Sequence, residues 1–252
     1  MTTHPFLCII TPVFDPGYKS LCKLIKELQC QTMDGFIHVM ISNGPSPRVR
    51  EMVGRLNKSD QRFIYDEMEK ETLNSPVEIL INLGKRRNYA MKKYDAERYI
   101  FLDADIKLVD DNYFLKLQKA HTETGKDILL TLVQMFDGNP NIIMPIFPIK
   151  LERIDLANYS FSRRIAKSID YPTDYDPQIG VANDYRFFTR ISNENNTELL
   201  NFMSAIRNGN NSYGNLLQMF QGNNPYRDLL QLLNSNKFYR RLLKLFRGLK
   251  VL

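Results

Sequence analysis

Two carboxylates, Asp103 and Asp105, end an apolar run and are separated by a single alanine. Residues 99–102 read Tyr-Ile-Phe-Leu, which indicates a strand buried on both faces of a parallel sheet. Alternate residues of an extended chain point the same way, and open α/β sheets bind ligands at the carboxyl ends of their strands. Because adjacent carboxylates repel each other, a divalent ion holding substrate phosphates would suit this pair. The alternative is that both aspartates only cap the next turn.

Two further stretches carry groups that could do chemistry. Gly84 is predicted to interrupt the chain, and the cations of Lys85-Arg86-Arg87 then stand at the start of a helix through Tyr94, where they would suit a diphosphate or a nucleotide. Asp184 lies near the start of a helix expected within 181–190, where the helix dipole favours a carboxylate. The alternatives are a solvated basic turn and a plain helix N-cap.

The elements that must position these groups alternate between strands and helices along the chain. Alternation of this kind predicts βαβ units and a mainly parallel sheet. Asp110-Asp111 can cap a helix that is expected to run to about His121. The other apolar runs predict strands at 6–14, 36–41, 62–65 and 127–133, and the helical periodicities predict helices at 18–31 and 49–56.

The bulk composition is that of an ordinary globular domain. The chain has 252 residues, of which 43% are hydrophobic and 25% charged. No apolar run approaches the length of a membrane-spanning helix, and the N-terminus does not resemble a secretory signal. Three cysteines without metal-ligand spacing favour reduced thiols in a cytoplasmic protein.

The net charge of +6 is concentrated at the C-terminus, where residues 237–250 carry six basic side chains and no acidic one. The remainder is neutral, which argues against a broad nucleic-acid surface. A helix is expected at 225–233, and residues 237–252 predict a basic amphipathic helix suited to an anionic membrane, here the inner face of the cell membrane. The alternative is that its leucines pack on the catalytic domain.

Taken in order, these stretches resemble a family 2 glycosyltransferase with the GT-A fold of nucleotide-diphospho-sugar transferases. The resemblance covers about residues 5–190. It rests on Ile10-Thr11-Pro12-Val13-Phe14-Asp15, Gln31-Thr32, Ile41-Ser42-Asn43-Gly44-Pro45-Ser46, the segment 84–88, the DXD motif Asp103-Ala104-Asp105, and Asn183-Asp184 with Arg190.

The resemblance implies a role for each matching residue. Asp184 would be the general base, and Asp105, with Asp103, would bind Mn²⁺ or Mg²⁺. Asn43 replaces an aspartate that often reads uracil; an amide can still pair with uracil, but the replacement leaves the base open. The residues that would contact the nucleotide sugar are Thr11, Pro12, Asp15, Asn43, Arg87, Asn88, Asp103 and Ala104.

The expected architecture is a single Rossmann-like, mixed but mainly parallel sheet flanked by helices. Residues 1–192 would form the catalytic domain, with a nucleotide-sugar half at about 5–106 and an acceptor half at about 107–192. Residues 193–252 would form a helical C-terminal extension that ends in the basic helix.

The expected activity is inverting, metal-dependent transfer of one sugar, from a UDP-sugar in the first instance, to a glycan or polyprenyl-linked acceptor in bacterial surface polysaccharide synthesis. The absence of tryptophan, and with it of the Gln-x-x-Arg-Trp motif, argues against a processive synthase. Two alternatives are a nucleotidyltransferase of the same fold, for which Asp15-Pro16-Gly17-Tyr18 is a poor triphosphate loop, and a non-catalytic protein of membrane surfaces.

Overall fold

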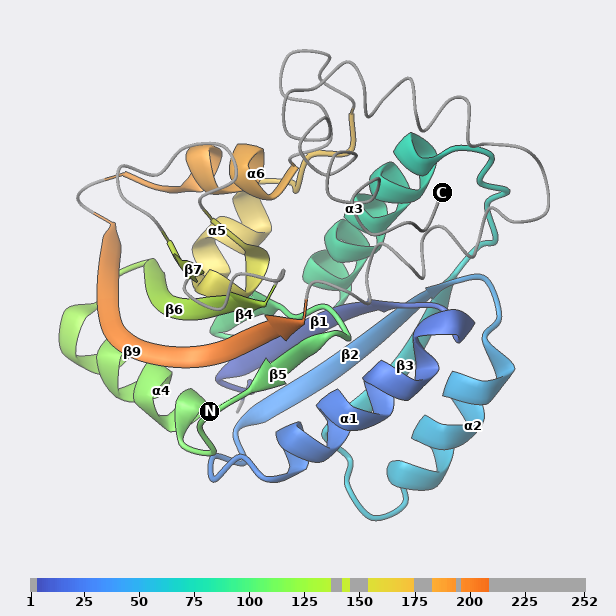
Figure 1. Ribbon diagram of the computed structural model, residues 1–252, viewed down its shortest axis with the longest axis horizontal. Coiled ribbons are helices and arrows are strands. Elements are labelled where there is room, and N and C mark those ends of the chain that lie inside the picture. Colours follow the sequence, from blue (N-terminus) through green and yellow to red (C-terminus); the bar gives the residue numbers. More distant parts are fainter. Residues whose placement is uncertain (1–3, 137–141, 146–153, 175–182, 194–195, 209–252) are drawn as a thin grey trace, which may run out of the picture.

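In the described part of the chain, a nine-stranded sheet lies at the centre (Figure 1). The computed structural model describes residues 4–136, 142–145, 154–174, 183–193 and 196–208. The strand order is β3-β2-β1-β4-β8-β6-β9-β5, and β7 pairs with β6 outside this path. The strands are β1 Leu7–Val13, β2 Phe36–Asn43, β3 Phe63–Met68, β4 Arg98–Phe101, β5 Ile106–Leu108, β6 Ile128–Phe136, β7 Ile142–Met144, β8 Tyr159–Ser162 and β9 Thr197–Asn208.

The parallel half of the sheet contains β1 to β4. Every residue of β1 is buried, because β2 and β4 pair with it on both sides and helices cover both faces. The mixed half contains β5 to β9, in which β8 runs antiparallel to both β4 and β6, while the long strand β9 lies parallel to β6 and antiparallel to β5. The predicted mixed, mainly parallel sheet is confirmed.

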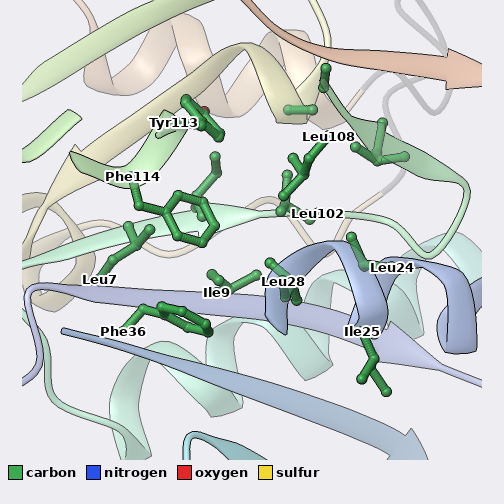
Figure 2. Close-up of a cluster of buried hydrophobic side chains, with 14 of the residues drawn as sticks. Leu7, Ile9, Leu24, Ile25, Leu28, Phe36, Leu102, Leu108, Tyr113 and Phe114 are labelled. Atoms are coloured by element: carbon green, nitrogen blue, oxygen red, sulfur yellow. The ribbon is translucent and has the colours of Figure 1, made fainter. Parts of the chain in front are cut away.

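Helices cover both faces of the sheet and give it two apolar layers. The helices are α1 Tyr18–Gln29, α2 Pro47–Leu56, α3 Pro76–Lys93, α4 Tyr113–Thr124, α5 Arg163–Ser168 and α6 Asn183–Ile191, with short 3-10 helices η1 Asp15–Gly17 and η2 Leu156–Asn158. One cluster joins α1, α2 and α4 to the sheet, and Figure 2 shows Leu28 of α1 beside Ile9 of β1 within it. The other cluster joins α3, α5 and α6 to the opposite face.

Helix α3 differs from the prediction, because it begins at Pro76 and passes through Gly84 without a break. Ser75 caps it, its hydroxyl accepting from the amide of Glu78, and Pro76 occupies the first turn. Gly84 serves packing rather than a turn, since a Cβ there would lie 2.8 Å from the carbonyl oxygen of Pro172.

Strand β9 is the largest departure from the sequence-based expectation. Residues 193–252 were expected to form a helical extension, but 197–208 form a strand inside the sheet. The expected helices at 225–233 and 237–252 lie outside the described residues. The helix that Asp110-Asp111 was expected to cap begins at Tyr113, with Asn112 as its N-cap, and the side chain of Asp110 accepts from the amide of Asn112.

Within the described ranges, none of the helices combines the length and apolar character needed to cross a membrane.

Candidate active site

The DXD aspartates lie directly after β4, in the turn that leads to β5. The amide of Leu102 still donates to Ile10 of β1, and the amide of Ile106 then donates to the carbonyl of Asp103, which closes the turn. Ala104 between them is half-buried and packs against the apolar cluster beneath α1. Both carboxylates are therefore held at the edge where the parallel strands end, as the sequence predicted.

Arg87 reaches Asp103 from α3. Its Nη2 donates to Asp103 Oδ1 at 3.0 Å. The guanidinium lies 5.4 Å from the ring centre of Phe101 and 5.0 Å from that of Tyr171, and the side chain is only 5% exposed. Two aromatic faces and a carboxylate thus fix a buried cation beside the DXD turn.

Arg207 reaches the same turn from the other half of the sheet. Its Nη2 donates to Asp103 Oδ2 at 2.9 Å, and its Nε lies 3.7 Å from Asp105 Oδ2. Its Nη1 pairs with Asp155, which caps η2 through a bond from the amide of Ala157. One guanidinium therefore holds three aspartates, and Asp103 accepts from an arginine on each of its oxygens.

Asp184 stands at the start of α6, where the sequence placed it. Its Oδ1 accepts from the hydroxyl of Tyr171 at 2.6 Å. Burial raises the pKa of Asp184, and the negative charges of Asp155 and Asp103 add to this, against the lowering effect of Arg87 and of the Tyr171 hydrogen bond. A carboxylate whose pKa is raised is a stronger proton acceptor once ionised, which suits a general base.

The DXD carboxyls respond differently to this environment. Burial opposes ionisation of Asp103, but Arg87 and Arg207 outweigh it and lower its pKa. Burial raises the pKa of Asp105 to about 6; Arg207 opposes the rise, and Asp103 and Asp155 add to it. The pKa of Arg207 lies above its usual range because three aspartates outweigh its burial.

The segment 171–174 is attached to α3 and α6. The side chain of Asn88 donates to the Tyr171 carbonyl at 2.9 Å and accepts from the Tyr171 amide at 2.7 Å. Asn183 donates to the carbonyl of Pro172. Asn88, expected to contact a nucleotide, therefore positions Tyr171 in this structure, and Tyr171 in turn orients Asp184.

The residues in and just after β1 and β2 that were expected to contact the nucleotide lie at the same edge of the sheet. Several of them already form hydrogen bonds within the protein. Thr11 has no exposed surface, and its hydroxyl donates to Leu102 and pairs with His38. Pro12 is buried within β1. Asp15 is exposed and accepts from the hydroxyl of Ser46.

Asn43 pairs with the backbone of Glu71 through both of its side-chain atoms. Its Nδ2 donates to the Glu71 carbonyl at 2.9 Å, and its Oδ1 accepts from the Glu71 amide at 2.8 Å. The amide that was expected to read a nucleotide base is thus used to hold the chain after β3. Base recognition by Asn43 stays a prediction.

Two residues near this edge, Asp155 and Arg207, were not found by sequence reasoning, and Arg86, expected beside a diphosphate or nucleotide, holds two strand ends together. Arg86 is buried, and its Nη1 donates to the carbonyls of Val13 and Ile41, joining the ends of β1 and β2. Asp155 and Asn158, three residues apart, form a capping box at the start of η2. Such a pair is a local signal for a helix start, but it does not indicate that Asp155 belongs to a charge cluster. Arg207 had no local signal, because its partners lie on β4 and η2, far away in sequence.

The expected divalent ion does not fit this arrangement. Oxygen donors of the kind that Mg²⁺ and Mn²⁺ prefer are present, but the guanidinium of Arg207 stands among them. In the described part of the chain, no group of three or more Asp, Glu, His or Cys side chains is arranged to hold a metal.

No family model and no curated sequence matches the chain. Solved structures do resemble it. S. aureus TarS 1-349 in complex with UDP has a TM-score of 0.63 at 15% identity, covering 98% of this chain and 75% of that one. The same protein with UDP-GlcNAc has a TM-score of 0.59 at 15% identity over 80% of this chain, and the match covers 58% of its length.

A second solved protein has the same architecture. The mannosyltransferase PcManGT from Pyrobaculum calidifontis, in complex with GDP-Man and Mn²⁺, has a TM-score of 0.56 at 12% identity, covering all of this chain and 77% of that one. Against another TarS structure the match covers only 43% of the longer chain. At these identities the comparisons bear on architecture: the chain has the GT-A-like fold of these glycosyltransferases.

Proposed function

We propose that this protein is an inverting glycosyltransferase that moves one sugar from a nucleotide-sugar donor, first of all a UDP-sugar, to a glycan or polyprenyl-linked acceptor in bacterial surface polysaccharide synthesis. The observation that carries the proposal is the position of Asp184. This half-buried carboxylate, brought in by α6, lies in one charge cluster with Arg87 and the DXD aspartates at the carboxyl edge of β4.

In the proposed reaction, Asp184 takes the proton of an acceptor hydroxyl while that oxygen attacks the anomeric carbon of the donor sugar. The bond from this carbon to the diphosphate breaks, and its electron pair leaves with the diphosphate. A single displacement inverts the anomeric centre. Arg87 and Arg207 supply fixed positive charge near the leaving group, where a preorganised cation stabilises the transition state.

Two parts of the proposal are supported by the sequence and by the solved relatives. The UDP and GDP-Man complexes of the neighbours support a nucleotide-sugar donor without choosing its base. The mannosyltransferase binds Mn²⁺, but here Arg207 holds the carboxylates, so a divalent ion is not part of this proposal. The peripheral position at the cell membrane rests on residues 237–252, outside the described ranges.

A thermal-shift titration with UDP, GDP, CDP and dTDP, each with Mn²⁺ and with EDTA, tests the donor site. A ligand at about a hundred times its Kd adds roughly 2.7 kcal/mol to the stability of the folded state. The nucleotide that binds then selects the donor, UDP-GlcNAc or GDP-Man. Transfer of its sugar to water or to lipid-linked glycan acceptors is measured next.

Asp184→Asn separates catalysis from binding. The variant should keep the nucleotide shift and lose roughly a hundredfold or more in transfer rate, since general-base catalysis contributes on the order of 10² to 10⁴. Asp60→Asn is the matched control, because Asp60 pairs with Arg62 before β3, at the other end of the strands. Full activity of folded Asp184→Asn would contradict the proposal.

A further inference from the structure

We propose that Arg207 is the resident cation of the DXD site, so that the donor diphosphate is bound without a divalent metal. The inference rests on the proposed function, because it concerns the diphosphate of a nucleotide-sugar donor. It starts from the place of Arg207 in the fold, where its guanidinium pairs with Asp103, Asp105 and Asp155 together.

The backbone of Arg207 is fixed by the sheet. In β9 it lies opposite Ile106 of the antiparallel neighbour β5 and opposite Met135 of the parallel neighbour β6. Ile106 directly follows Asp105, so the register alone brings the arginine beside the second DXD carboxylate. Because strands on both sides pair with its backbone, Arg207 has a fixed place beside the site. A surface arginine in a loop would not be held there in this way.

The guanidinium pairs with one oxygen of each carboxylate that a metal would need. Asp103 accepts from Arg87 on one oxygen and from Arg207 on the other, and Asp105 faces Arg207 Nε. An incoming ion would have to break these pairs and leave Arg207, whose side chain is only 16% exposed, beside a divalent charge. Two cations cannot share this position without repelling each other.

The guanidinium also retains donors for an anion. Each of its terminal nitrogens carries two N–H groups, and one on each is used by Asp155 and Asp103. Among the described residues, no further hydrogen bond uses the second N–H of either nitrogen, so both can donate to phosphate oxygens, which arginine binds in a bidentate manner. Arg207 can thus hold the aspartates on one side and receive the leaving diphosphate on the other.

Calorimetric binding of UDP and GDP to the full-length protein, in EDTA and in Mn²⁺, tests this directly. The inference expects the same Kd for the bound nucleotide in both buffers. A Kd weaker by roughly tenfold or more in EDTA, a loss of about 1.4 kcal/mol, would overturn it and leave the proposed function standing. If neither nucleotide bound in either buffer, the inference and the proposed function would both fail.

The second arm measures Mn²⁺ itself by EPR, without nucleotide. Wild type and Arg207→Lys, which keeps the charge, should leave Mn²⁺ free, whereas Arg207→Ala should bind more Mn²⁺, because removing the shared guanidinium lets Asp103, Asp105 and Asp155 rearrange around an ion. Arg163→Ala is the matched control, since Arg163 pairs with Asp95 before β4, at the other end of that strand. Mn²⁺ binding by wild type as tight as by Arg207→Ala, or no binding by a folded Arg207→Ala, would overturn the inference. Circular dichroism reports whether each variant folds, and the wild-type arm does not depend on it.

Discussion

The two halves of the sheet contribute charges that neither can balance alone. The parallel half, β1 to β4 with α1 to α3, supplies the DXD aspartates and Arg87 from one edge. The mixed half supplies Arg207, Asp155 and Asp184 from a long strand, a 3-10 helix and a helix start. Asp103 accepts one bond from each half, through Arg87 and Arg207. The candidate site is therefore complete only when both halves are in place.

Replacing Arg87 should be the most damaging change to this arrangement. Arg87→Met keeps much of the volume between Phe101 and Tyr171 but removes a buried cation and leaves half-buried Asp103 with one arginine fewer. Removing one partner of a buried ion pair costs about 3 to 5 kcal/mol, which chemical denaturation would measure. Arg87→Lys keeps the charge and should lose less. An unchanged unfolding free energy in Arg87→Met would mean that the mixed half alone balances Asp103.

Gly84→Ala tests the contact between the halves by volume rather than by charge. The new methyl group would lie 2.8 Å from the Pro172 carbonyl oxygen and 3.1 Å from Tyr171 Cδ1. Overpacking of this kind costs about 1 to 3 kcal/mol, and the shift of Tyr171 should lower transfer activity as well.

Gly54→Ala provides the matched control, since Gly54 lies in α2 with open space around its Cβ position. Alanine there should stabilise the protein by up to about 1 kcal/mol through helix propensity. If both variants had equal stability, the close approach of α3 to residues 171–173 would not be a real constraint.

His38, a buried residue of β2 in the parallel half, makes the free energy of unfolding depend on pH. Burial lowers its pKa to about 3 from an ordinary 6.5, so the unfolded chain takes up a proton at a pH where the native protein does not. Its contribution to stability is complete above pH 6.5 and is lost as the pH falls toward 3. The loss at pH 5 is about 2 kcal/mol by linkage. Denaturation of wild type and His38→Gln across this range should show a shallower pH dependence in the variant.

Tyr171→Phe is expected to have the smallest effect, and only on the mixed half. The ring that faces Arg87 is kept, while the hydroxyl that stabilises ionised Asp184 is lost. The pKa of Asp184 should rise further, so the acid limb of the kcat/KM profile should move to higher pH with little change on the plateau. A limb that moved to lower pH would exclude Asp184 as the titrating base.

Sequence reasoning was most successful where a functional side chain follows a buried parallel strand. The apolar run before Asp103 predicted β4, and the helix start at Asp184 is where it was expected. Continuous apolar runs such as residues 7–13 have few other stable arrangements, because both faces of such a strand must be covered. The fold class followed from the alternation of these runs with helices.

Contacts between distant segments could not be predicted in this way. Arg207 lies in a strand that was assigned to a helical extension, and its pairing with Asp103 spans 104 positions. Gly84 was interpreted as a local break in the chain. The structure instead explains the glycine by the close carbonyl oxygen of Pro172, which is far away in sequence. Hydrophobic periodicity reports burial along one element, but it carries no information on which elements will meet.

The irregular pairing of β9 has a consequence for counting along the chain. From Leu130 to Val133, β6 advances three residues, while β9 advances six, from Leu199 to Ala205. An unbroken ladder from Leu199 would place Ser204, not Arg207, opposite Met135. Because the surplus is odd, it also reverses which alternate residues of β9 face each side of the sheet. Deleting one residue between 199 and 205 would leave every functional side chain in the sequence and still turn the guanidinium away from its carboxylates. The site therefore depends on the number of residues in β9 before Arg207 as well as on their types.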